Sequence, residues 1–123
     1  ESLSSLSTGV DKLEVPSGMT FIAASAFEDT GFSEVDLPAT LAMIGRRAFY
    51  NCRKLSTVTC RRTGVVPALD ADYPAETFGG VGITGQRTLK VNPQAKKAYQ
   101  TDPLWIKATP EAGGNIVWTI EDI

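Results

Sequence analysis

The stretch from Leu13 to Cys60 repeats itself, and this repeat is the strongest constraint on the fold. Equivalent apolar residues and prolines recur 22 residues apart: Leu13 and Val35, Val15 and Leu37, Pro16 and Pro38, Ile22 and Ile44, Ala26 and Ala48, and Phe27 and Phe49. A third copy begins with Val58-x-Cys60, 23 residues after Val35. Because so short a unit cannot bury its own apolar face, the repeat predicts a stack of coils that cover one another.

Each unit has two parts. The first alternates polar and apolar residues, which is typical of a short strand with one face in the core, at 12–15, 34–37 and 57–60. The second predicts an extended piece near 21–23 and 43–45, followed by a single helical turn that carries the Ala-Phe pair. Stacked coils place Phe27 on Phe49 and join the strands in parallel ladders. The predicted fold is a small α/β solenoid of right-handed coils.

The third unit is irregular. It continues from Cys60 as RRTGVVPALDADYPAETFGG, and if Phe78 corresponds to Phe49 this coil has 29 residues rather than 22. Its prolines and glycines indicate loops. Two interpretations remain open: a loop that projects from one edge and carries a ligand contact, or a bulge that only spans the last coil.

The C-terminal part predicts a cap for the stack. Residues 88–91 alternate like the earlier strands, and Asn92 with Pro93 favours a helix over 94–100 that ends before Pro103. We expect Trp105, with Leu104 and Ile106, to cover the open end of the core, and 116–120 to form a last strand. The chain is therefore predicted to be one domain, with a degenerate start at 1–9, repeats at 10–91 and a cap at 92–123.

Composition narrows the class of function. The length of 123 residues suits one domain, and a net charge of −2 with a pI near 5.1 gives no reason to expect nucleic acid as a partner. No apolar run has the roughly 20 residues of a membrane helix. The chain starts at Glu1 without an initiating Met or an apolar leader, which we interpret as processing or trimming.

Catalytic and metal chemistry find little support. The chain has no His, which removes the commonest general base and zinc ligand. Asp70-x-Asp72 lacks the further oxygen ligands of a calcium loop, and the glycines at 79–85 have no preceding buried strand or following helix for a phosphate site. We expect no catalytic residue, no cofactor and no metal. Cys52 and Cys60 fall at positions expected to be buried, and a disulfide between them is left open.

Two sets of surface residues are candidates for binding. Outward strand positions of successive coils should line up in columns, and the candidate binding face consists of Lys12, Glu14, Glu34, Asp36, Thr57, Thr59 and Lys90. The secondary candidate is basic and comprises Arg46, Arg47, Arg53, Lys54, Arg61 and Arg62. An acidic glycan or acidic protein segment is the ligand class that the basic set would take, although its members need not share a face. An ordinary solvated sheet is the alternative interpretation of the candidate binding face.

Two segments of the sequence resemble a known family of repeat proteins. The segment VDLPATLAMIGRRAFYNCRKL, residues 35–55, resembles the BspA-like class of bacterial leucine-rich repeats, whose pattern is L-x-x-V-x-L-P-x-x-L-x-x-I-G-x-x-A-F-x-x-C. The first unit departs from it modestly, with Ala23 at the usual Gly and Thr30 at the Cys position. TLKVNPQAKKAYQTDPLW is similar to the segment that closes many such proteins. The resemblance covers about two thirds of the chain.

The resemblance implies a bacterial surface or secreted protein that mediates adhesion, with no enzymatic activity. We therefore expect a non-catalytic module that binds an extracellular protein or glycan. The alternative is a structural cap or spacer, or a module that associates with another copy of itself. An enzyme is the third hypothesis, which turnover abolished by a single carboxylate substitution would revive.

Overall fold

The computed structural model describes residues 11–80 and 82–123. The expected degenerate start at 1–9, and Val10 as the beginning of the repeats, lie outside the described residues. In chain order the elements are β1 (Lys12–Glu14), β2 (Phe21–Ile22), β3 (Glu34–Leu37), β4 (Met43–Ile44), β5 (Thr57–Cys60), the 3-10 turn η2 (Pro74–Glu76), β6 (Gly85–Val91), α1 (Lys96–Thr101), α2 (Pro103–Ala108) and β7 (Ile116–Asp122).

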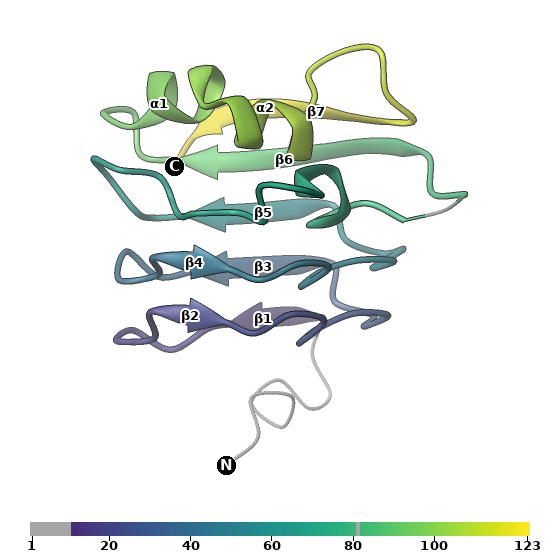
Figure 1. Cartoon of the computed structure of the whole chain (residues 1–123), viewed down its shortest axis with the longest axis horizontal. Helices are drawn as coiled ribbons and strands as arrows, with labels where there is room; N and C mark the ends of the chain where they lie inside the picture. Colours follow the sequence, from purple (N-terminus) through teal and green to yellow (C-terminus); the bar gives the residue numbers. More distant parts are fainter. Residues whose placement is uncertain (1–10, 81) are drawn as a thin grey trace.

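One strand of each coil enters a single large sheet. Its order is β1-β3-β5-β6-β7, and every neighbouring pair is parallel. Figure 1 shows these strands stacked from the purple N-terminal coil to the yellow C-terminal strand. The alternation explains the register, because Leu13, Val35, Val58 and Leu89 pair in sequence and are all buried. The predicted parallel ladder is confirmed.

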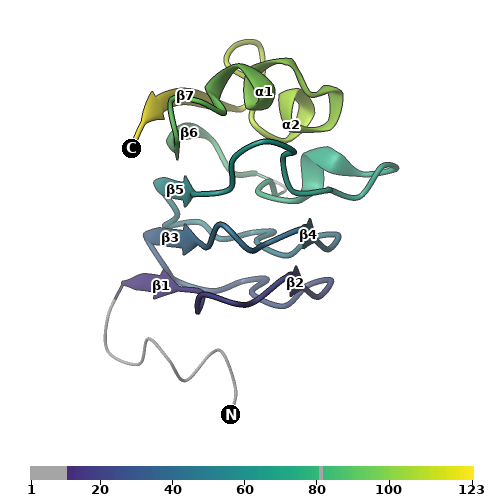
Figure 2. The ribbon, with the colours of Figure 1, turned by 90° about the vertical axis from the view of Figure 1, so that its left-hand side faces the viewer.

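A second, two-stranded parallel sheet joins β2 to β4 on the opposite side of the coils, as Figure 2 shows. The third coil continues it only through a single bridge between Met43 and Ala68. Ile22 and Ile44 point inward from this sheet and are buried, whereas Phe21 and Met43 are half exposed. The core therefore lies between the two sheets.

The segments that carry the Ala-Phe pairs are turns, so the predicted single helical turn is wrong. Ser25, Asp29, Arg47 and Asn51 all have φ near +60°, which breaks a right-handed helix at each of these residues. Amide groups of the turns instead donate to the next coil: the Phe27 N–H to Ala48 O (2.9 Å) and the Phe49 N–H to Thr77 O (3.0 Å). The turns thus hold successive coils together on a third side.

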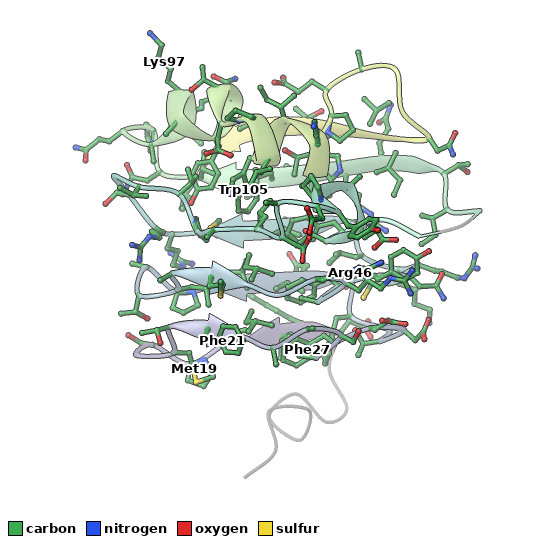
Figure 3. The ribbon with its side chains drawn as sticks, viewed as in Figure 1. Met19, Phe21, Phe27, Arg46, Lys97 and Trp105 are labelled. Atoms are coloured by element: carbon green, nitrogen blue, oxygen red, sulfur yellow. The ribbon has the colours of Figure 1, made fainter. Side chains whose placement is uncertain are left out.

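The phenylalanine rings stack as the repeat predicts. Phe27 lies on Phe49 with ring centroids 5.5 Å apart and planes 14° apart, and Phe49 lies on Phe78 at 5.6 Å and 13°. Phe78 is therefore the equivalent of Phe49 in the long third coil. Figure 3 shows Phe27 inside the first coil of the stack.

The third coil follows its neighbour rather than projecting freely from the edge. The Ile44 N–H donates to Ala68 O at 2.9 Å, and the Asn51 N–H donates to Gly79 O at 2.6 Å. Between these points the chain makes the short η2 turn, with Tyr73 half exposed beside it. The extra residues widen the coil locally and leave its contacts to the second coil in place.

Two helices and one strand close the C-terminal end of the stack. α1 begins at Lys96 rather than Gln94, because Asn92 and Ala95 first form a turn in which the Ala95 N–H donates to Asn92 O. β6 begins at Gly85, three residues earlier than predicted, and pairs along its full length with β7. Trp118 and Ile120 of β7 face inward and are buried, as the alternation predicts.

Helix α2 was not predicted. Asp102 accepts hydrogen bonds from the Leu104 and Trp105 N–H groups (3.0 and 3.1 Å), and Pro103 occupies the first helical position, so the proline begins a helix as well as ending α1. Trp105 is fully buried, and its Nε1 donates to Pro67 O at 2.9 Å. Ile106, expected to help cover the core, is instead half exposed.

Candidate functional site

The outward residues of the large sheet form two continuous columns. Strand register places Lys12 beside Glu34, Thr57 and Thr88 in the first column, and Glu14 beside Asp36, Thr59 and Lys90 in the second. Their inward neighbours are buried, so the polar side chains stand on the opposite face of the sheet. We call this surface the strand face.

The last strand extends both columns. Thr119 of β7 pairs with Thr88, and Glu121 pairs with Lys90. The alternation of 116–120 indicated a strand, but nothing in the sequence located it next to β6. The first column consequently carries threonines on β5, β6 and β7, and its charged residues lie on β1 and β3.

Ion pairs restrain part of the strand face. Arg61 holds Asp36 in a two-pronged contact, with Nε at 2.8 Å from Oδ1 and Nη2 at 2.9 Å from Oδ2. This contact raises the pKa of Arg61 above its usual value. Lys12 and Glu14 are 3.7 Å apart and well exposed, which makes a weak, screened pair. Glu34 is exposed and pairs with no cation in the described part of the chain. Arg61 thus belongs to the strand face as well as to the basic set.

Arg46 and Arg47 share one carboxylate in the third coil. Glu76 accepts from Arg46 Nε at 2.9 Å and from Arg47 Nη2 at 3.1 Å. These arginines lower the pKa of Glu76, chiefly through the Arg47 hydrogen bond. Arg46 also lies 3.8 Å from the ring centre of Tyr73, and Figure 3 labels this arginine at the middle of the stack. We call Arg46, Arg47 and Glu76 the Glu76 clamp, because it fixes the widened coil to its neighbour.

The remaining basic residues lie elsewhere. Arg62 donates to Val65 O at 2.7 Å within its own loop. Arg53 and Lys54 are exposed in the turn after Phe49 and border a hollow of about 260 Å³. The structure therefore divides the six basic residues among several places, and they do not make one patch.

Both cysteines are buried and free, so the open disulfide does not form. Cys60 Sγ lies 3.0 Å from the Tyr99 hydroxyl, which donates to Arg62 O. Burial raises the pKa of the Cys60 thiol to about 11 and raises the pKa of Cys52 as well. Neither thiol has the lowered pKa of a reactive cysteine.

Asp70 is used locally, where its Oδ1 accepts from the Asp72 and Tyr73 N–H groups, each at 2.9 Å. Over residues 11–80 and 82–123, no three metal-ligating side chains come together. Within the same residues, neither α-helix, at six residues each, has the length to cross a bilayer.

Comparison with known proteins assigns the chain to a family. Residues 5–65, about half of the chain, match the model of the BspA type Leucine rich repeat region (6 copies). No curated protein and no solved structure matches the chain significantly. The matched segment contains the stacked coils with the Phe27 and Phe49 rings, so the family match and the geometry rest on the same repeat. The chain belongs to the BspA-type leucine-rich repeat family.

Proposed function

We propose that this chain is a non-catalytic binding module whose strand face contacts an extracellular protein or glycan in adhesion. The observation that carries the proposal is the register of five parallel strands, which presents two unbroken columns of polar and charged side chains. A flat polar surface of this kind suits an extended partner better than a small molecule. The family supports the proposal, since BspA-type repeats are modules associated with protein binding and adhesion.

The proposal includes an architecture and a location. The strands form one face of a right-handed solenoid, residues 10–91 are its repeats, and 92–123 are the cap of the same single domain. The buried Trp105 and Trp118 support the role of the cap, because both pack on the ring of Phe78 in the last coil. A bacterial cell-surface or extracellular location agrees with the family, and antibody labelling of intact producing cells tests it.

The experiment is a binding screen of the chain against extracellular matrix proteins and glycans, repeated with two double variants. Glu14→Lys/Glu34→Lys reverses charges on the strand face, whereas Asp72→Lys/Glu111→Lys makes the same charge change at exposed positions elsewhere. We expect only the first variant to lose the ligand. A ligand bound equally by both variants would remove the strand face as the site, and a screen without any ligand would contradict the binding function.

A second candidate is self-association. Among the described residues β1 pairs only with β3, so one edge of this strand has no strand partner there. Exposed strand edges pair readily with further strands. Sedimentation across a wide concentration range tests this candidate: a dimer that forms with rising concentration supports it, and a monomer throughout excludes it.

A further inference from the structure

The hollow at the turns of the first two coils differs from the strand face in place and chemistry. It is lined by Asp29, Thr30, Gly31, Asn51, Arg53 and Lys54, so none of its side chains is a large apolar one. A lining without aromatic or aliphatic walls gives an apolar ligand nothing to pack against. A ligand for this place must therefore be polar over its whole surface.

Arg53 and Lys54 supply uncompensated positive charge. Arg46, Arg47 and Arg61 of the basic set are paired with carboxylates, but Arg53 and Lys54 enter no ion pair in the part of the chain that the structure describes. Two exposed cationic side chains that border the same hollow favour an oxyanion, carboxylate or sulfate.

The floor of the hollow is ordered in advance. Asp29 and Asn51 are equivalent residues of adjacent coils, with φ of 63° and 61°, and the Asn51 Nδ2 donates to the Asp29 carboxylate. The Asp29 N–H donates to Tyr50 O at 2.9 Å, and Thr30 contacts Cys52 Sγ at 3.3 Å. Turns fixed in this way lose little freedom when a ligand binds.

Asp29 decides which kind of anion fits. Its carboxylate repels a ligand that carries only negative charge, but it accepts hydrogen bonds from hydroxyl groups. A sugar unit with an acid group offers both, since its acid group can meet Arg53 and Lys54 while a hydroxyl donates to Asp29. An acidic peptide such as oligoglutamate has no hydroxyl groups and can offer Asp29 only its backbone N–H donors.

We propose that this hollow binds an acidic saccharide, through a carboxylate or sulfate on Arg53 and Lys54 and a hydroxyl on Asp29. The site does not depend on the strand face, and the two can be lost independently. The acid group of the saccharide is either a uronate or a sulfate ester, and the probes distinguish these.

The test is calorimetric titration of the chain with four probes: an oligogalacturonate, a heparin-derived oligosaccharide, a neutral maltooligosaccharide and a glutamate oligopeptide. We expect one or both acidic saccharides to bind, and Arg53→Gln/Lys54→Gln to weaken that binding by about tenfold or more. Lys97→Gln/Lys107→Gln is the matched control, because it makes the same charge change at two exposed lysines of the C-terminal helices that enter no ion pair in the described residues, and Lys97 projects from the far end of the stack (Figure 3). The control should bind like the unchanged protein.

Asp29→Asn tests the choice of ligand class, since Asn tolerates the positive φ at this position. It should improve peptide binding more than saccharide binding, so the preference for saccharide falls. Equal losses in the two double variants would show non-specific attraction and overturn the site. Absence of acidic-saccharide binding, or peptide binding as tight as saccharide binding in the unchanged protein, would overturn it too.

Discussion

The first two coils and the widened third coil are held in place by different means. In the first two coils the same residue types recur 22 positions apart and stack directly, as Phe27 does on Phe49. The third coil lacks this repetition over 61–77 and depends on particular polar partners: the Glu76 clamp, the Trp105 indole on Pro67 and the buried Arg87. Periodicity fixes a regular coil, whereas individual long-range contacts fix an irregular one.

The regular coils should respond most strongly to loss of a stacked ring. Phe49 is fully buried between Phe27 and Phe78. We expect Phe49→Ala to lower the free energy of unfolding by about 3–5 kcal/mol, because it leaves a cavity in the middle of the stack. Urea denaturation measures the change, and Phe49→Leu, which keeps most of the volume, should lose clearly less. Equal, small losses in both variants would contradict a continuous ring stack.

The second-largest loss of stability is expected at the link between the third coil and the C-terminal elements. Arg87 is buried and donates to Phe78 O and to Cys52 O (2.9 Å), with its guanidinium 5.8 Å from the Trp118 ring. Arg87→Met removes the donor to Phe78 O and leaves Cys52 O with only the Leu55 N–H (3.2 Å), and we expect a loss of about 2–3 kcal/mol. Lys97→Met at an exposed cap position is the control and should be nearly neutral. A neutral Arg87→Met would mean that the guanidinium does not hold the third coil.

The Glu76 clamp should act locally and depend on pH. The pKa of Glu76 is lowered in the folded state. The contribution of the Glu76 clamp to stability is therefore present above the unfolded pKa of a glutamate and is lost as the pH falls through the lower folded value. We expect Glu76→Gln to speed amide exchange around 73–80 and to leave 12–37 unchanged, with little effect on Tm because the pair is partly exposed. In the unchanged protein, acid should likewise lower the protection factors of 73–80, which are corrected for the slower intrinsic exchange in acid. Faster exchange throughout the chain would contradict a local role.

The smallest expected effect is at Thr77. Its hydroxyl is buried and has no hydrogen-bond partner within the described structure, while its backbone carbonyl accepts a hydrogen bond from the Phe49 N–H. Thr77→Val removes the unpaired hydroxyl and keeps the shape, so we expect stability to be unchanged or to rise by up to about 1 kcal/mol. Thermal unfolding measures it, and a clear loss would mean that the hydroxyl has a partner.

The sequence predicts the regular coils of this molecule better than its irregular parts. The 22-residue spacing predicted the ladders and the stacking of Phe27 on Phe49, because packing of equivalent residues needs no knowledge of distant partners. The place of Phe78 in the ring stack was only a conditional assignment, since it lies 29 residues after Phe49, and the structure supports it. The sequence pattern missed the positive φ values, for which Asp29 and Asn51 at equivalent positions were the available signal. It also missed α2, because Pro103 was interpreted as a stop although Asp102 before it is a good N-cap.

Among the candidate surface residues, the sequence predicted the columns of the strand face but not which of the charged side chains form ion pairs. The pairing of Asp36 on β3 with Arg61, which directly follows β5, joins residues 25 positions apart, and that of Glu76 with Arg47 spans 29 positions. No periodic pattern announces such pairs. The sequence left open whether the basic residues share a face, and these pairings help to divide them in the structure.

The central claim is that equivalent residues of successive coils lie directly on one another, and contacts between ring protons test it most directly. In protein with labelled phenylalanine rings, we predict nuclear Overhauser effects between Phe27 and Phe49 and between Phe49 and Phe78, and none between Phe27 and Phe78. Missing contacts for either neighbouring pair, or a direct contact between the outer two rings, would contradict the stacked coils.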